Sequence, residues 1–529
     1  MADSAEASVR AANRLRHTVL TGLCDLLDQQ VRDRPDARAL VVTADRHDVS
    51  YSALSATVDD VAASLGGAGL RRADAVGLVC ANTAEFVIAL LGAARAGLVV
   101  APLDPALPQA EMTARLARLG ARAILVGPSA VDAAPAGQSG IPTWAVRVDI
   151  SAGGTATASL ETGADAVHHV RAAPVHSDND ALVLFTSGTT DRAKMVPLTH
   201  ANVAASVQGI CEVYDLSPGD ATVAVMPLFH GHGLFAVLLA TLASGGCILL
   251  PEKGRFSAHT FWGDMQAVAA TWFTAVPTIH EILLERSALE YPGPQAVPLR
   301  FVRTCSAPLN VGTAHAMECT FGVPVLSAYG MTETSHQATS EPLPAHGRLK
   351  RGSVGRATGV ELRVVDQQGH SCAAGTVGEV WVHGPTVARG YLGDPAATSQ
   401  SFAARWFRTG DLGSLDEDGY LFLTGRIKNI INRGGEKISP EHVESVLAGC
   451  AGVTEAAVFA VPDPIYGERV GAAVVLVQAG SLRSEQILQE CRNQLSPFEI
   501  PDRLEIVDAL PHTAKGALDR RAVENQYAH

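Results

Sequence analysis

The sequence predicts an α/β protein with at least two domains, and three observations support this fold class. The chain has 529 residues, which is more than one ordinary hydrophobic core organises. Short apolar segments, such as residues 39–42 and 76–79, alternate with helical patterns over residues 39–127, as is typical of βα units. A turn and a short strand at residues 416–423 precede a C-terminal segment of about 100 residues, the size of a small domain.

The alternation of strands and helices is interrupted once in the first part of the chain. Residues 128–178 are poor in aromatic residues and rich in Ala, Gly, Ser and Thr, so we expect a surface excursion that carries no chemistry. Ordered βα patterning resumes at residues 181–185 and continues to about Tyr391.

The hinge between the two domains is expected at Lys428, which gives an N-terminal domain of residues 1–427 and a C-terminal domain of residues 428–529. In the smaller domain, Ser439 and Pro440 start a helix, because a capping hydroxyl and a proline at the first helical position both favour helix starts. This helix has one apolar face, formed by Val443, Val446 and Leu447.

Composition and charge argue against several classes of protein. Hydrophobic residues make up 47% of the chain and charged residues 18%, as in a soluble globular protein. The net charge of −13 argues against binding to nucleic acid. Nine cysteines without a Cys-x-x-Cys pair indicate reduced thiols rather than a disulfide framework or a zinc site.

No membrane segment is expected. The N-terminus is charged and has no apolar core segment, so we expect no secretory signal and a cytoplasmic location. Residues 86–103 come nearest to a membrane span, but they include Gly92, Arg95 and Pro102. A buried helix followed by a strand explains this segment better.

A cluster of hydroxyl residues and glycine follows the apolar strand that ends at Phe185. Hydroxyls and flexible backbone amides after a strand can wrap phosphate oxygens, and a lysine nearby adds positive charge. Spacing excludes a Walker A loop, and taken alone the segment fits an ordinary turn equally well. The residues are Thr186, Ser187, Gly188, Thr189, Thr190 and Lys194.

Further motifs follow in a fixed order at residues 329–333, 409–411, 425–428 and 510–520. With the hydroxyl-rich loop, this order resembles that of the adenylate-forming enzymes, which include acyl-CoA synthetases, luciferases and peptide-synthetase adenylation domains. The resemblance covers nearly the whole chain, from about Leu26 to Arg521. It implies a large N-terminal α/β domain of several subdomains and a small, mobile α+β C-terminal domain.

The resemblance also implies an activity and its substrates. A carboxylic acid and ATP would form acyl-AMP and pyrophosphate, with Mg²⁺, and coenzyme A would then form a thioester. A carrier-protein phosphopantetheine thiol is an alternative acceptor, because both thiols enter by the same route.

Nucleotide-binding roles carry over from the family motifs to matching positions. Thr186, Ser187, Gly188, Thr189, Thr190 and Lys194 match the phosphate loop, and Ser306, Ala307 and Pro308 match the lining of the adenine pocket. Tyr329 would stack on adenine and Thr332 would contact the α-phosphate. Glu333 would hold Mg²⁺, a hard cation suited to carboxylate oxygens. Asp411 would accept hydrogen bonds from the ribose hydroxyls, with Arg426 assisting.

Two further elements match the steps that require domain movement. Gly434, Gly435 and Glu436 match the loop that swings in for thioester formation, where glycines suit a close approach to the CoA arm. Lys428 matches the hinge.

Within this superfamily, several segments are similar to the oxalate–CoA ligases. Oxalate keeps a second carboxylate beside the reacting one, so its pocket needs polar donors rather than an apolar tunnel. The candidate donors are His230, His232, His336 and Ser306. A histidine before glycine is also common at helix starts, and a medium-chain fatty acid or another small acid is an alternative substrate.

The phosphate loop departs from the family pattern, because the usual Gly-x-Pro-Lys-Gly reads Asp191-Arg192-Ala193-Lys194-Met195. Asp191 places a negative charge beside bound triphosphate, which weakens binding unless Arg192 offsets it. Replacement of glycine at Asp191 and Met195 reduces conformational freedom, and Ala193 lacks the rigidity of proline.

The C-terminal element departs at its catalytic position, because Gly516 is followed by Ala517 where the family has lysine. That lysine bridges the acid and the α-phosphate, and charge stabilisation of this kind contributes about 3–4 kcal/mol. Lys515 lies two residues earlier, about 6–7 Å of extended backbone away. Three hypotheses follow: a ligase in which Lys515 substitutes, an enzyme impaired in adenylation alone, and a nucleotide- or CoA-binding protein without turnover. Because the rest of the element is intact, Ala517 fits either a natural loss or an engineered change.

Overall fold

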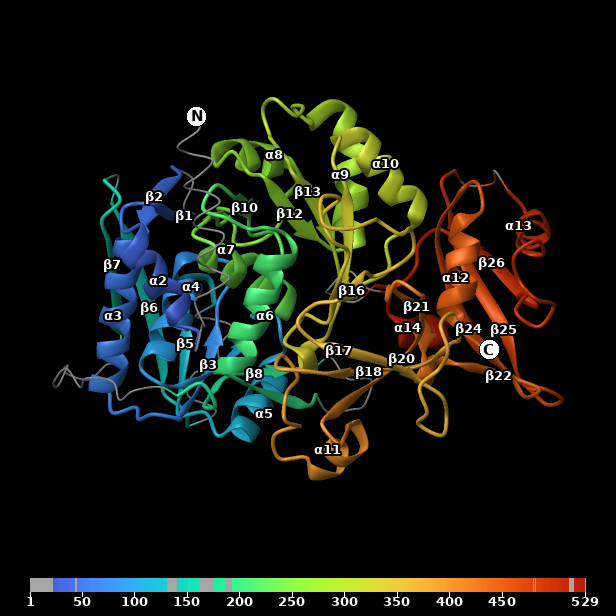
Figure 1. The fold of residues 1–529 in the computed structure, drawn as a ribbon, viewed down its shortest axis with the longest axis horizontal. Coiled ribbons are helices and arrows are strands. Elements are labelled where there is room, and N and C mark those ends of the chain that lie inside the picture. Colours follow the sequence, from blue (N-terminus) through green and yellow to red (C-terminus); the bar gives the residue numbers. More distant parts are fainter. Residues whose placement is uncertain are drawn as a thin grey trace.

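A mostly parallel sheet forms the first part of the fold (Figure 1). The computed structural model of the chain describes residues 22–42, 45–130, 140–151, 153–161, 176–186, 193–478, 480, 482–512 and 518–528. The sheet runs in the order β7-β6-β5-β3-β4-β8-β9, with antiparallel neighbours at both edges. Its strands are β3 (Ala75–Val79), β4 (Val99–Leu103), β5 (Ala123–Val126), β6 (Thr143–Ile150), β7 (Ala156–Glu161), β8 (Asp180–Phe185) and β9 (Met195–Thr199).

A second sheet carries residues of the candidate site at the ends of its parallel strands, and runs in the order β12-β13-β14-β15-β16. Its strands are β12 (Trp272–Ala275), β13 (Phe301–Thr304), β14 (Val325–Tyr329), β15 (Thr339–Ser340) and β16 (Arg356–Ala357). A third sheet, β10-β11-β1-β2, is built from β1 (Arg38–Val42), β2 (His47–Ser50), β10 (Ala221–Val223) and β11 (Cys247–Leu249). The strands predicted at residues 39–42 and 76–79 are confirmed as β1 and β3.

Helices pack around these sheets. The segment of residues 86–103 is a buried helix, α4, followed by the buried strand β4, as its sequence predicts. The α-helices of this part are α2 (Asp25–Asp33), α3 (Tyr51–Gly67), α4 (Ala84–Arg95), α5 (Gln109–Leu119), α6 (His200–Val213), α7 (Ala240–Ala243), α8 (Ala258–Ala267), α9 (Pro277–Glu290), α10 (Val311–Phe321) and α11 (Pro395–Ser401). The remaining short segments are η1 (Pro128–Ala130), the π-helix η2 (His232–Leu239) and η3 (Thr332–Thr334). No described helix is both long enough and apolar enough to span a membrane.

The prediction that residues 128–178 form only a surface excursion was wrong for their middle part. β6 and β7 pair with each other and extend the large parallel sheet beyond β5. Trp144 and Val146 are buried because apolar residues alternate with polar ones along β6. This alternation lies within a stretch whose overall composition is that of a loop.

The C-terminal part of the chain has its own sheet and core. A connecting sheet, β17-β18-β20-β19 with β21 on β20, lies between it and the larger part (Figure 1). Its strands are β17 (Glu361–Val365), β18 (Gly378–His383), β19 (Phe402–Ala403), β20 (Trp406–Leu415) and β21 (Leu421–Arg426). The C-terminal sheet contains β22 (Ile431–Arg433), β23 (Glu436–Ile438), β24 (Val453–Asp463), β25 (Gly467–Leu476) and β26 (Arg503–Val507), with η4 (Ile427–Asn429), α12 (Pro440–Gly449), α13 (Ser484–Cys491) and α14 (Arg520–Tyr527).

The predicted start of the C-terminal helix is confirmed. Ser439 is the N-cap of α12 and accepts a hydrogen bond from the backbone N–H of His442, and Pro440 is the first helical residue. Val443, Val446 and Leu447 are buried in a core cluster formed within the C-terminal part. The domain boundary at Lys428 itself stays a prediction.

Leu447→Ala should destabilise the small domain, since the side chain is fully buried in its core. We expect the free energy of opening, measured by amide hydrogen exchange of α12 and β24, to fall by about 2–4 kcal/mol. Val477→Ala is the control, because Val477 is 72% exposed and its truncation should change stability by less than about 0.5 kcal/mol. Equal effects of the two changes would contradict this core assignment.

Candidate active site

The predicted phosphate loop is described only at its two ends. Ser187, Gly188, Thr189 and Thr190 lie outside the described residues, as do Asp191, Arg192, Lys515 and Ala517. At the ends, the Thr186 backbone N–H donates to the Lys194 carbonyl at 3.0 Å. Met195 is the first residue of β9 and pairs with Phe185, so the backbone there is extended and does not require glycine.

The predicted ribose and adenine residues form one cluster. Asp411 in β20 and Arg426 in β21 are register partners, and Arg426 Nε lies 2.7 Å from Asp411 Oδ1. The hydroxyl of Tyr329, at the end of β14, donates to Asp411 Oδ2 at 2.7 Å. Two neighbouring strands, β20 and β21, and the distant strand β14 therefore hold one carboxylate in place.

Asp411 is almost fully buried, with 4% of its surface exposed. Burial raises the pKa of its carboxyl group, and the Arg426 guanidinium and the Tyr329 hydroxyl oppose that shift. Each carboxylate oxygen accepts one described bond and keeps capacity for another. The geometry is thus compatible with the expected acceptance of hydrogen bonds from two vicinal hydroxyls.

Lys194 and Glu333 lie on either side of Tyr391. The Tyr391 hydroxyl donates to Glu333 Oε1 at 2.8 Å, and Lys194 Nζ lies 4.4 Å from the centre of the Tyr391 ring. Glu333 is buried in η3, and burial raises the pKa of its carboxyl group despite the opposing Tyr391 hydroxyl and Lys194 charge. The sequence did not single out Tyr391, because no spacing relates it to Glu333.

Three of the four predicted acid-binding residues, His232, Ser306 and His336, come together near Arg303. His232 Nδ1 lies 3.1 Å from Ser306 Oγ, and the His232 and His336 rings stack with centroids 5.2 Å apart. Arg303 Nη2 lies 3.2 Å from His336 Nε2. This cluster joins η2, the end of β13 and the turn after η3.

Arg303 is fully buried, and its other partners are neutral groups. They are the Tyr214 hydroxyl, the Thr274 hydroxyl, the Gln337 side-chain oxygen and the Cys305 side chain. Among the residues described by the structure, no Asp or Glu forms an ion pair with Arg303. A buried cation without an acidic partner is costly, and an anion bound beside it would offset that cost.

The histidines of this cluster are held neutral. Burial lowers the pKa of His232 and of His336 well below the ordinary histidine range, and the Arg303 charge lowers both further. Neutral imidazoles leave Arg303 as the source of positive charge in the cluster.

The backbone of the cluster is strained at two positions. Ser306 and His336 are non-glycine residues in the left-handed region, at φ +76° and +73°. A Cβ at Gly330 would lie 1.9 Å from the His336 carbonyl oxygen, so only glycine permits the approach of the β14 end to His336. Strain of this kind persists where the surrounding structure enforces it and is common at functional sites.

The remaining predicted residues lie close to residues of these clusters. The His230 ring packs against Phe229, with centroids 4.6 Å apart. Lys428 lies in η4, and burial and the Arg426 charge lower the pKa of its amino group. Thr332 starts η3, and Ala307 and Pro308 follow β13 in the loop that begins with Ser306.

The predicted CoA loop is turned away from these clusters. Gly434 and Gly435 connect β22 to β23, which begins at Glu436, and Figure 1 shows β22 on the side of the small domain away from the large one. The neighbouring Arg433 bonds to the Phe498 carbonyl and to Asp502 in its own domain.

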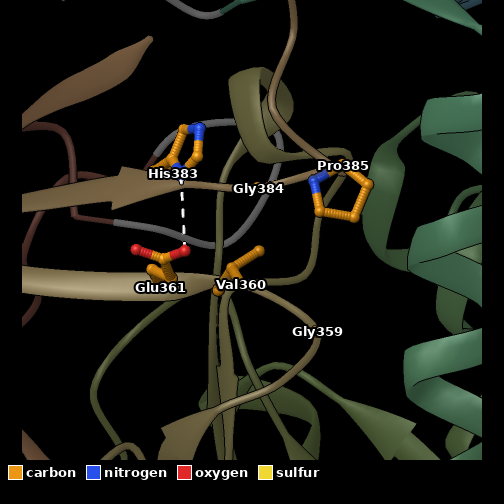
Figure 2. A pocket seen from close by; sticks show the side chains of 6 residues that line it. All are labelled: Gly359, Val360, Glu361, His383, Gly384 and Pro385. Carbon is orange, nitrogen blue, oxygen red and sulfur yellow. Dashed lines mark ion pairs between the residues drawn. The ribbon is translucent and has the colours of Figure 1, made fainter. Parts of the chain in front are cut away.

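A separate pocket lies where β17 begins and β18 ends (Figure 2). His383 Nδ1 and Glu361 Oε1 are 3.7 Å apart at its edge. None of the residues predicted for the site lines this pocket, which is bounded by Gly359, Val360, Glu361, His383, Gly384 and Pro385. In the described part of the chain, no group of three His, Cys, Asp or Glu residues could hold a metal ion.

Two comparisons with protein families cover most of the chain. The AMP-binding enzyme model matches residues 27–392, and the AMP-binding enzyme C-terminal domain model matches residues 442–517. This chain belongs to the AMP-binding enzyme family. The expected membership of the adenylate-forming superfamily is therefore confirmed, and so is the fold of a large N-terminal and a small C-terminal domain.

Individual proteins match this chain along most of their length. The oxalate–CoA ligase of Arabidopsis thaliana is 41% identical over 513 residues, which cover 96% of this chain and 98% of that protein. The oxalate–CoA ligase of Saccharomyces cerevisiae is 36% identical over 490 residues, covering 86% and 87%. The crystal structure of ATP-bound MatB from Rhodopseudomonas palustris superposes with a TM-score of 0.84 at 30% identity, covering 95% and 98%.

Glu333→Gln should stabilise the fold at neutral pH, since burial raises the pKa of Glu333 and its ionised form is the disfavoured one. Glutamine still accepts from Tyr391 but has no charge, so we expect a higher midpoint of thermal unfolding about pH 7–8. The advantage should shrink as the pH falls from the raised pKa of folded Glu333 towards the ordinary value of 4.5, and it should be absent below 4.5, where Glu333 is protonated in both folded and unfolded chains. A difference that is constant with pH would contradict this assignment.

Proposed function

We propose that this enzyme is an ATP-dependent acid–CoA ligase and that its acid is a small dicarboxylate such as oxalate. The acid attacks ATP to give acyl-AMP and pyrophosphate, and the thiol of coenzyme A then displaces AMP to give acyl-CoA. Membership of the AMP-binding family and the names of the two relatives support this reaction class.

The observation that carries the choice of acid is the buried Arg303 cluster. A guanidinium without an acidic partner and three neutral polar side chains, His232, Ser306 and His336, favour an anionic group beside the reacting carboxylate. The pocket of a medium-chain fatty acid needs apolar lining instead, because burying a polar group against a hydrocarbon chain costs free energy. The cluster therefore favours oxalate over that alternative.

The cluster of Tyr329, Asp411 and Arg426 supports roles in binding the nucleotide. Asp411 accepts from the ribose hydroxyls, and Arg426 and Tyr329 hold its carboxylate in place. The Tyr329 ring, with Ser306, Ala307 and Pro308, receives the adenine. Lys194, together with Thr186, Ser187, Gly188, Thr189 and Thr190, holds the triphosphate, and Thr332 contacts the α-phosphate.

Glu333 fits Mg²⁺, because it supplies a hard carboxylate oxygen beside the end of the phosphate loop. Tyr391 holds that carboxylate through Oε1, and Oε2 is the oxygen that we propose for the cation. When bound, Mg²⁺ would neutralise charge on the phosphates of the nucleotide.

The thioester step requires the small domain to present another surface. We propose a rotation about Lys428 that brings Gly434, Gly435 and Glu436 from the outer side of the small domain to the thiol. Coenzyme A is the proposed acceptor, and a carrier-protein thiol is the alternative.

An enzyme impaired in adenylation is the second candidate, and Ala517 is the observation that favours it. In that case the acyl-AMP supplied from outside would still react with coenzyme A. Arg303, Asp411 and Glu333 serve both candidates equally.

Pyrophosphate release from Mg-ATP should depend on oxalate and not on octanoate, because the acid pocket offers donors and a buried cation. The measurement is the release rate with each acid at matched concentrations, with acetate as the acid that lacks a second polar group. Faster release with octanoate than with oxalate would overturn the choice of acid.

Ala517→Lys and Lys515→Ala separate a working ligase from an impaired one. If Lys515 substitutes, Lys515→Ala should reduce pyrophosphate release with oxalate by about 100-fold or more, the loss expected for one transition-state donor. If adenylation is impaired, release should be absent in the chain as it stands and restored by Ala517→Lys. If none of the three proteins releases pyrophosphate in the presence of oxalate, the result would contradict both candidate functions and favour a binding protein.

A further inference from the structure

Arg303 can only donate hydrogen bonds, and this restricts the protonation of everything that touches it. A guanidinium has no acceptor atom, so each of its partners must accept. Its Nη2 lies 3.2 Å from His336 Nε2, and its Nη1 lies 3.2 Å from Thr274 Oγ1. Thr274 and Arg303 are register partners on the neighbouring parallel strands β12 and β13, so the sheet itself fixes the second contact.

His336 must therefore accept at Nε2. The ring is neutral, because burial and the Arg303 charge disfavour its protonated form, so its single proton is on Nδ1. Within the described residues, Nδ1 of His336 has no acceptor. The ring presents this N–H as an unused donor.

Thr274 transmits the same restriction to His232. The Thr274 hydroxyl is buried and has two described partners, Arg303 Nη1 and, at 2.7 Å, His232 Nε2. It accepts from Arg303, and its own proton finds an acceptor only if His232 Nε2 accepts it. His232 then carries its proton on Nδ1.

The chain of donors ends at Ser306. His232 Nδ1–H donates to Ser306 Oγ across 3.1 Å, which leaves the Ser306 hydroxyl proton for another acceptor. Ser306 is exposed and held at φ +76°, and the stacked His336 ring lies beside His232. Two unused donors, Ser306 O–H and His336 Nδ1–H, thus belong to the same small cluster.

We propose that Arg303 and Thr274 are positioning residues that fix the proton on Nδ1 of both His232 and His336, so that Ser306 and His336 act as donors to the acid. The consequence is a preference for acids whose second group accepts hydrogen bonds at every oxygen, as a carboxylate does. This inference rests on the proposed function for the identity of the ligand, whereas the proton positions stand on the protein alone.

Thr274→Val tests the transmission through Thr274, because it removes the hydroxyl and keeps the shape. We expect the KM for oxalate to rise about tenfold, the effect of one lost hydrogen bond to a charged ligand, with the KM for ATP changed less than about twofold. Thr274→Ser should restore the KM for oxalate. Thr222→Val is the matched control, since Thr222 is a buried strand threonine whose hydroxyl has no described partner.

Histidine ¹⁵N spectra read the proton positions directly and require no activity. In the unmodified chain, multiple-bond ¹H–¹⁵N correlations should show His232 and His336 protonated at Nδ1, with assignments from single histidine variants. Thr274→Val should convert His232 to a mixture of tautomers and leave His336 unchanged. In a folded Arg303→Met variant, both His232 and His336 should become mixtures of the two tautomers.

Substitution of His336 provides a further discrimination. The side-chain N–H₂ of asparagine falls near the position of Nδ1, and that of glutamine near Nε2. His336→Asn should therefore retain more oxalate-dependent activity than His336→Gln.

These measurements separate the inference from the proposed function. Nδ1 protonation of both rings, without turnover of any acid by the chain or by Ala517→Lys, supports the positioning roles and overturns the proposed ligase. Oxalate turnover with Nε2 protonation of either ring, or with an unchanged oxalate KM in Thr274→Val, overturns the positioning roles and leaves the ligase in place.

Discussion

A buried guanidinium without an acidic partner is the constraint on which the proposed acid-binding half of the site depends. Arg303 is 0% exposed, in the middle of a sheet, and its described partners are neutral. Burying such a charge is unfavourable unless hydrogen bonds and an opposite charge compensate it. The hydroxyls of Tyr214 and Thr274 and the amide of Gln337 satisfy its donors, and a bound anion would complete the compensation. Burial, together with the same positive charge, keeps both neighbouring histidines neutral.

The end of β14 connects this cluster to the nucleotide side. Tyr329 donates to Asp411, and the next residue, Gly330, lets the backbone pass against the His336 carbonyl. Asp411 is in turn fixed by its register with Arg426. A displacement at the end of β14 would therefore disturb the acid site and the ribose site together, which suits a reaction that joins the two bound substrates.

The family resemblance predicted much of this arrangement, because its motifs contain most of the residues that meet in the two clusters. Tyr329, Asp411 and Arg426 were predicted as one site and are in contact, and His232, Ser306 and His336 likewise. Other features depend on tertiary contacts that no local pattern encodes. Tyr391 reaches Glu333 across 58 positions of sequence, and Thr274 meets Arg303 only through strand register. A charged residue within the apolar strand β13 was the sequence feature that could have pointed to Arg303. The strand β6 was missed because the residues around it have the composition of a loop.

The most direct test of the central claim is equilibrium binding of oxalate in the presence of AMP, measured by titration calorimetry on the chain and on Arg303→Met. This measurement does not depend on Lys515 or Ala517, because no adenylation is required. The account predicts that oxalate binds to the chain, that hexanoate does not, and that oxalate binding is lost in folded Arg303→Met. Tighter binding of hexanoate, or oxalate binding unchanged by the loss of Arg303, would contradict it.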